Sequence, residues 1–219
     1  MRKVKKIFFL TVIISLFMVP LMLIRANANT LVYADYVVDW DRGTVTGDFP
    51  GWYGGSLSTF PIPLTDAEAE AAILGPPDTK FLSLPGNPND EGIGPPNVSA
   101  WVIVGFNTPI MNMAGPDLFI TELGANNESA DIWVWDPSGE EYYVGKFTRN
   151  GSDILAIDYA LSGYTGLVTM VAIVGLDELG GSKGFDLDAV GGTPVPIPTT
   201  ILLLGSGFIS LIGFRKKLI

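Results

Sequence analysis

Short stretches of alternating apolar and polar residues recur along the middle of the chain, with turn-forming residues such as Asn150-Gly151 and Gly180-Gly181 between them. These stretches are rich in β-branched and aromatic residues, which favour strands. The predicted strands are LVYADYVV (31–38), WVIVGF (101–106), DLFITEL (117–123), DIWVWD (131–136), EYYVGKF (141–147), DILAIDY (153–159), LVTMVAIVGL (167–176) and FDLDAV (185–190). Strands of this length separated by polar turns predict an all-β domain, an antiparallel β-sandwich.

The clearest local element is a hairpin. Segments 131–136 and 141–147 have strand character, and the turn-forming residues 137–140 (PSGE) join them directly. The sequence therefore predicts that these two strands pair with each other.

One short segment has helical character instead. Thr65 and Glu68 have the spacing of a helix capping box, and the apolar run that follows stops at Gly75-Pro76-Pro77. This predicts a helix of about two turns. The stretch from Leu84 to Pro96 is rich in proline, glycine and asparagine, which predicts a surface loop.

The N-terminus has the pattern of a secretory signal peptide. A basic start precedes an apolar run from Ile7 to Ile24, and Ala26 and Ala28 supply the small residues that a signal peptidase recognises. We expect cleavage after Ala28, so that residues 1–28 are the signal peptide. The alternative is an uncleaved membrane anchor, because an apolar run of about 18 residues is long for a signal sequence.

The C-terminus predicts a membrane span. Residues 197–214 are largely apolar, and as a helix they would extend roughly 27 Å, enough to cross a bacterial inner membrane. The basic residues Arg215, Lys216 and Lys217 follow directly, and cationic residues beside a span stay on the cytoplasmic side. The domain before the span is therefore expected outside the cytoplasm.

This tail carries a family resemblance. Its proline motif is Val195-Pro196-Ile197-Pro198, followed by an apolar helix containing Gly205-Ser206-Gly207 and then by the basic ending. Together these features resemble the PEP-CTERM sorting signal, in its VPLPA/VPIPA-type variant. The resemblance implies recognition by an exosortase-type membrane protease, cleavage near the prolines, and delivery to the cell envelope or extracellular matrix of a Gram-negative bacterium that makes exopolysaccharide. The alternative is an ordinary tail anchor.

Charge limits the partners of the domain between the two ends. Residues 29–193 contain 23 acidic and five basic residues, a net charge of −18. Such a domain repels nucleic acid and anionic lipid headgroups, so nucleic-acid binding is excluded, and it attracts divalent cations or basic partners. Equally, the negative charge could serve only to keep an exported protein soluble.

The absence of cysteine and histidine excludes several kinds of chemistry. The chain has no disulfides, no thiolate or Ser-His nucleophile, and no thiolate or imidazole metal ligand. A carboxylate-dependent glycoside hydrolase needs only two Asp or Glu residues, but nothing in the sequence marks two of the 23 acidic residues. We therefore expect no catalytic residues and a protein that is not an enzyme.

A second resemblance covers the domain itself, over residues 71–190. AAILGPPDTKFLSLP, the segment from Trp101 to Phe147 and the final GFDLDAV are similar to an extracellular domain with the galactose-binding-like jelly roll of carbohydrate-binding modules. The resemblance implies a jelly-roll sandwich that associates with extracellular polysaccharide. The chain departs from it before Trp101, where residues 87–91 (NPNDE) stand in place of a compact glycine-rich turn.

Calcium is the metal that these residues favour, because it binds carboxylate and carbonyl oxygens. Asp186 and Asp188 alternate with apolar residues on a predicted strand, so we expect both to face solvent if the apolar residues face the core. The predicted calcium ligands are Asp78, Asp117, Glu122, Asp186 and Asp188. The alternatives are a solvated strand face or an aspartate that caps a turn.

Two pairs of aromatic residues are candidates for sugar contact. Trp133 and Trp135 share one face of a strand, where they could stack on sugar rings with Tyr142 or Tyr143, although core or cross-strand packing is the commoner role. Trp52 and Tyr53 lie in a glycine-rich stretch, PGWYGG, where core packing explains an aromatic less readily. They are the predicted ligand-binding residues.

The sequence thus predicts a signal peptide (1–28), an extracytoplasmic β-sandwich (29–193) and a sorting and anchoring tail (194–219). The predicted function is that of a non-catalytic envelope or matrix protein, held in the inner membrane before sorting and associated with exopolysaccharide. The alternatives are a carboxylate-dependent enzyme that cleaves polysaccharide and a purely structural matrix protein without a specific ligand.

Overall fold

The computed structural model describes residues 30–45, 47–56, 58–59, 61–90, 98–177 and 182–195. The predicted signal peptide with its cleavage site at Ala26 and Ala28 lies outside these residues, as does the tail from Pro196 onward. Within the described residues, no helix has both the length and the apolar character needed to cross a membrane.

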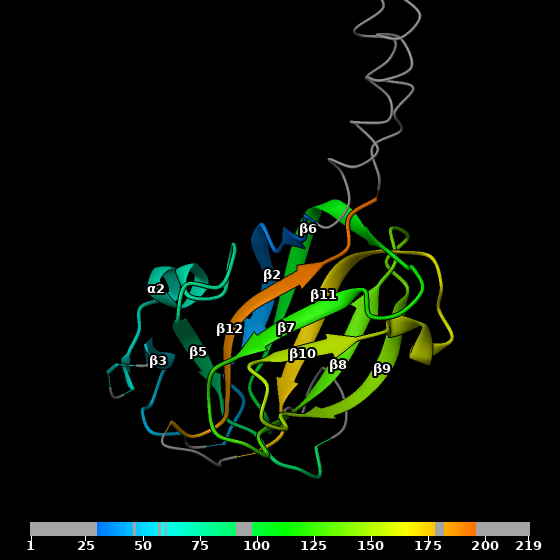
Figure 1. Ribbon diagram of the computed structural model, residues 1–219. Helices are drawn as coiled ribbons and strands as arrows, with labels where there is room; N and C mark the ends of the chain where they lie inside the picture. The colour runs from blue at the N-terminus through cyan, green and yellow to red at the C-terminus, as the bar shows by residue number, and fades with distance from the viewer. Residues whose placement is uncertain are drawn as a thin grey trace, which may run out of the picture. The chain divides into compact units, whose positions relative to one another are not determined.

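Residues 31–195 fold into two antiparallel β-sheets that face each other (Figure 1), which confirms the predicted all-β sandwich. In strand order, sheet A contains β10 (Ile154–Ile157), β7 (Leu118–Glu122), β12 (Phe185–Gly192), β5 (Lys80–Leu84), β3 (Tyr53–Ser56) and β4 (Ile62–Pro63), with β1 (Val32–Tyr33) also paired to β12. Sheet B contains β2 (Tyr36–Asp41), β6 (Trp101–Met111), β11 (Leu167–Gly175), β8 (Ser129–Trp135) and β9 (Glu141–Thr148).

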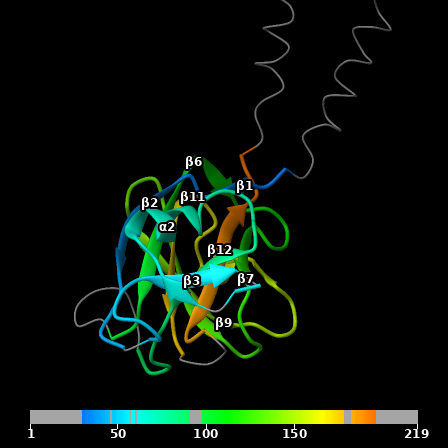
Figure 2. The same cartoon turned by 90° about the vertical axis from the view of Figure 1, so that its left-hand side faces the viewer.

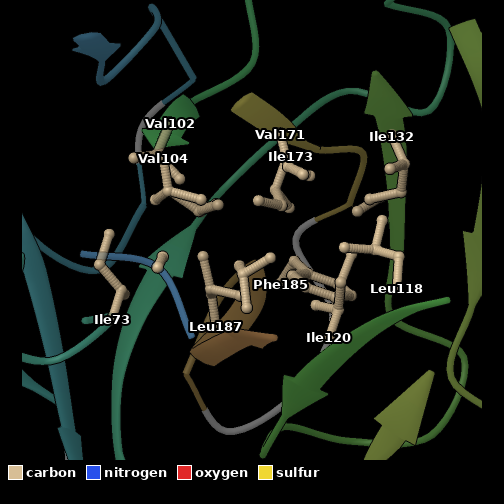
Figure 3. Close-up of a cluster of buried hydrophobic side chains, with 14 of the residues drawn as sticks. Ile73, Val102, Val104, Leu118, Ile120, Ile132, Val171, Ile173, Phe185 and Leu187 are labelled. Atoms are coloured by element: carbon tan, nitrogen blue, oxygen red, sulfur yellow. The ribbon is translucent and has the colours of Figure 1, made fainter. Parts of the chain in front are cut away.

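The core lies between the sheets because alternate residues of each strand point toward the opposite sheet. Sheet B contributes Val102, Val104, Ile132, Val171 and Ile173, and sheet A contributes Leu118, Ile120, Phe185 and Leu187 (Figure 3). All of these side chains are fully buried. Burying each one contributes about 1.5–3 kcal/mol relative to leaving it in water.

The helix α2 (Asp66–Ala71) confirms the predicted capping box. Thr65 N donates to Glu68 Oε2 at 2.9 Å, and Glu68 N donates to Thr65 Oγ1 at 3.3 Å. The helix has six residues, which agrees with the predicted length of about two turns, and Ile73 just after it inserts into the core. Figure 2 shows α2 and β3 at the same edge of the sandwich.

Two parts of the strand prediction were wrong. Segment 31–38 is two strands rather than one, because the chain crosses between the sheets: Ala34 N donates to Val190 O in sheet A, and Asp35 N donates to Gly105 O in sheet B. Strands β3, β4 and β5 were not predicted. Glycine in β3 and proline in β4 hide the usual strand signal.

The hairpin prediction is confirmed by the pairing of β8 with β9, which includes Trp133 opposite Tyr143. The described part of the predicted loop, from Pro85 to Asp90, has no regular strand or helix. Leu84 itself belongs to β5.

The strand register gives the sandwich two distinct ends. At one end, which we call the loop end, strands β2, β5, β7, β9 and β11 finish and strands β6, β8 and β12 begin. The two sheets are joined there by Gly86 N, which donates to Asp177 O, and by Ala100 N, which donates to Pro85 O. The opposite end holds both limits of the domain, since Val32 pairs with Gly192 and Val195 N donates to Pro109 O.

Candidate functional site

The outer face of sheet B, which points away from the core, carries most of the large aromatic residues of the sheet. Register places its outward residues in three rows across the five strands. They are Glu141–Trp135–Met170–Gly105–Tyr36, Tyr143–Trp133–Ala172–Ile103–Asp39 and Lys146–Asp131–Val174–Trp101–Asp41. None of these residues belongs to the core cluster. Among the described helices and strands, none makes extensive contacts with this face, although Trp101, Asp131 and Val174 are themselves buried.

Trp133 and Tyr143 form a contacting aromatic pair on this face, at its β8–β9 side. Their ring centroids lie 4.8 Å apart with the planes tilted by 48°, a cross-strand contact between β8 and β9. Tyr143 is 45% exposed, and its hydroxyl donates to Asp131 Oδ1 at 2.8 Å. Trp133 and Trp135 therefore lie on the outer face of sheet B, where Trp133 packs across strands against Tyr143. Neither tryptophan belongs to the core between the sheets.

Two tryptophans on the same face have unpaired donors. In the part of the chain that the structure describes, the indole N–H groups of Trp101 and Trp133 are buried and have no acceptor. An unpaired buried donor costs about 1–3 kcal/mol, and such groups in a native structure call for a functional or structural reason.

A cleft of about 530 Å³ continues this face at the loop end. Ser129 and Lys146, on strands β8 and β9, line it together with Asn127 and Asp177 from neighbouring loops. Asp177 is fixed there because its carboxylate accepts a hydrogen bond from Ser129 N. The aromatic rows thus lead into a cleft whose wall carries amide, hydroxyl and charged groups.

A separate group of buried acidic residues lies at the same end. Glu122 and Glu128 are both fully buried, and Arg149 Nε lies 2.9 Å from Glu122 Oε2. Burial, followed by the hydrogen bond with Glu122, raises the pKa of Glu128 to about 10. Burial also raises the pKa of Glu122, while the hydrogen bond from Glu128 and the charge of Arg149 oppose that shift. At neutral pH Glu128 is therefore protonated and donates to Glu122.

The predicted calcium ligands do not converge. Glu122 and Asp186 are both at the loop end, and Asp188 binds the backbone N–H groups of Asp78 and Thr79 at 3.1 and 3.2 Å. Asp78 instead pairs with Lys80 at 2.7 Å.

The fifth predicted ligand lies at the opposite end of the sandwich. Asp117 is buried there and accepts a hydrogen bond from Met113 N at 2.7 Å. Among the described residues, no three acidic side chains are grouped as a metal ion requires.

The expectation that Asp186 and Asp188 face solvent was wrong. They are 4% and 3% exposed, because β12 is central in sheet A and its outer face is covered. Ser83 donates to Asp186 Oδ1 at 2.6 Å, and burial raises the pKa of Asp186 to about 7. The sequence pattern showed which face they occupy, but it could not show that other parts of the chain cover that face.

Packing explains the positions of Trp52 and Tyr53, although we expected core packing to account less readily for aromatic residues in a glycine-rich stretch. Trp52 belongs to the core cluster and contacts Trp40 with ring centroids 4.9 Å apart. Tyr53 is 1% exposed and its hydroxyl donates to Lys183 O. Both line a smaller cleft of about 220 Å³, together with Asp41 and Arg42. A role in ligand contact stays a prediction.

The sequence reading did not single out Asp131, Glu128, Arg149 or Asp177. Asp131 had a signal, because it alternates with Trp133 and Trp135 and so shares their face. The other three lie at strand ends or in loops, where no periodicity marks a buried side chain.

No protein-family model matches this chain, and no curated protein matches it significantly.

Proposed function

We propose that this protein is an exported, non-catalytic component of the cell envelope or extracellular matrix that binds polysaccharide on the outer face of sheet B. One observation carries the proposal: the partly exposed Trp133–Tyr143 pair on a sheet face with which no described strand or helix makes extensive contacts. Flat aromatic rings offer an apolar surface on which a sugar ring can stack.

The finer fold and the sorting route belong to the same proposal. We propose that the sandwich has jelly-roll connectivity and that an exosortase-type protease removes a membrane-spanning tail beyond Val195. The two antiparallel sheets are compatible with that connectivity, and the register places both limits of the domain, Val32 and Gly192, at the end opposite the cleft.

The mass of the mature protein tests the route. We expect the intact mass from its native cells to match a chain that begins at Asn29 and ends near the Val195–Pro198 motif. A protein that keeps residues 199–219 would instead be a resident membrane protein and would contradict sorting.

Replacing Trp133 with alanine is expected to weaken glycan binding by about 30-fold. Removing a central aromatic contact costs about 2 kcal/mol or more at a binding surface, and 1.4 kcal/mol is tenfold in affinity. Binding of residues 29–195 to a glycan array, followed by titration calorimetry with the best ligand, measures this effect.

The matched control is Phe119→Ala, which removes a partly exposed aromatic residue from the outer face of sheet A. It should leave affinity unchanged. Tyr143→Phe keeps the ring but loses the hydrogen bond to Asp131, so its loss should be smaller than that of Trp133→Ala. If the array shows no ligand at all, the protein is a structural matrix component and the proposal fails.

Calcium binding stays a prediction, and the structure does not bring its five expected ligands together. Repeating the titration with EGTA tests it: a loss of affinity that added Ca²⁺ restores would support a bound ion.

Polysaccharide cleavage is not favoured by the acidic pair of this structure. Glu122 and Glu128 are within hydrogen-bonding reach of each other, whereas the two carboxyl groups of a glycosidase stand about 5 Å or more apart with the substrate between them. Both are also fully buried.

A further inference from the structure

We propose that the polysaccharide held on the outer face of sheet B carries free amino groups, as a hexosamine polymer does when part of its N-acetyl groups is missing. This inference rests on the function proposed above. It concerns the chemical class of the ligand, which neither the fold nor the sorting route specifies.

The first argument is the charge along the aromatic rows. Asp39 and Asp41 are exposed on edge strand β2, and Glu141 is exposed on β9 at the other side of the sheet. Asp131 lies between them on β8, but it is buried and accepts from the Tyr143 hydroxyl, so it adds negative charge beneath the surface and offers no direct contact. Lys146 is the only basic residue in the three rows, so the surface around the rings is predominantly negative.

The second argument is how these carboxylates are held. Asp39 Oδ1 accepts from Trp40 N at 2.9 Å, and Asp41 Oδ1 accepts from Gly43 N at 2.8 Å. These bonds orient the two aspartates within their own strand and the turn that follows, and neither contact involves a cation. Their register partners are Ile103 and Trp101, which places both charges beside the apolar part of the face.

The third argument excludes the opposite class of ligand. A net charge of −18 over residues 29–193 repels polymers of uronic acid and sulfated or phosphorylated glycans. A ligand with protonated amines gains attraction from the same field and keeps an apolar ring face to place on Trp133 and Tyr143. Neutral sugars gain only the ring contact.

The test compares three oligosaccharides of equal length: a glucosamine hexamer, its fully N-acetylated form and a hexuronate hexamer. With residues 29–195 at low salt and a pH at which the amine is protonated, we expect the glucosamine hexamer to bind at least tenfold more tightly than the N-acetylated form. The difference should shrink strongly in 1 M salt, where charges are screened within about 3 Å.

Asp39→Asn combined with Asp41→Asn should remove this preference while keeping the affinity for the N-acetylated hexamer. The matched control is Asp66→Asn with Glu70→Gln, which removes two exposed charges on α2 and should keep the preference. Equal affinity for the two hexosamine ligands, or tighter binding of the hexuronate, overturns the inference and leaves the proposed function standing. Binding of none of these ligands, together with an empty glycan array, overturns both.

Discussion

Replacing Glu122 with alanine is expected to lower the free energy of unfolding by about 3–5 kcal/mol, the usual cost of removing one partner from a buried ion pair. The change leaves Arg149, which is largely buried, without the carboxylate 2.9 Å from its Nε, and it removes the acceptor for the proton of Glu128. In a domain of this size, that loss lowers the melting temperature by roughly 10 °C. Urea unfolding of residues 29–195 at pH 7 measures it.

Asp153→Ala is the matched control, because Asp153 pairs with the same arginine. Its side chain is 61% exposed, and an exposed ion pair contributes about 0–1 kcal/mol. We therefore expect a change below 1 kcal/mol. Equal losses for the two variants would contradict a stabilising role for the buried Glu122–Glu128–Arg149 group.

The second large expected effect is a loss of stability as pH rises from 5 to 8. The pKa of Glu128 is raised from 4.5 to about 10 and that of Asp186 from 3.8 to about 7, in both cases mainly by burial. A carboxyl group whose folded pKa is raised binds more protons in the folded state than in the unfolded state. Its stabilisation is therefore full below the unfolded pKa and is lost as pH rises toward the folded pKa, by up to about 1.4 kcal/mol per pH unit for each proton.

Melting temperature measured at pH 5, 6, 7 and 8 tests this. Carboxyl groups with a lowered pKa, such as Asp78 and Asp136, act mainly below pH 4, so they contribute little to this range. Glu128→Gln resembles the protonated side chain and should flatten the curve, raising the melting temperature at pH 8 relative to the wild type. Exposed Glu141→Gln should leave the curve unchanged. A wild-type protein as stable at pH 8 as at pH 5 would contradict the arrangement in which protonated Glu128 donates to Glu122.

The acidic pair also bears on the loops that shape the cleft. Glu122 Oε1 accepts from Gly124 N, Glu128 Oε1 accepts from Ala125 N at 2.8 Å, and Arg149 donates to Gly124 O. A Cβ on residue 124 would lie 1.8 Å from Glu128 Oε2, so a larger residue there would have to displace the Glu128 carboxyl group. Because Asn127 and Ser129 follow in the same segment and line the cleft, these buried bonds position one wall of the proposed ligand site.

Local patterns predicted the parts of the fold that depend on local chemistry. Alternation in β8 and β9 and the turn between them gave the hairpin, and the Thr65–Glu68 spacing gave the start of α2. Strand β3 was not predicted because YGGS has no alternation of apolar and polar residues. Its glycines are needed where the backbones of β3 and β5 approach closely. A Cβ on Gly54 would lie 1.9 Å from Phe81 O.

For the candidate site, the sequence identified the aromatic residues but not their surroundings. It placed Trp133 and Trp135 on one strand face without deciding whether that face was core. The register of β8 between β9 and β11 decided it, because Ile132 and Val134 occupy the core side. For Trp52 the sequence expectation failed, since a glycine-rich stretch says nothing about which distant residues will cover an aromatic ring.

The sequence by itself determined the strand-rich character of the domain, its strong negative charge and the absence of thiol and imidazole chemistry, because these follow from residue identity and short-range periodicity. Only the tertiary structure decided which polar residues are buried, how Glu122, Glu128 and Arg149 meet, and that the five predicted metal ligands do not gather at one place. The physical reason is that burial and charge pairing depend on contacts between strands and loops distant in the chain. Sheet register sets those contacts, and local residue pattern carries no information about it.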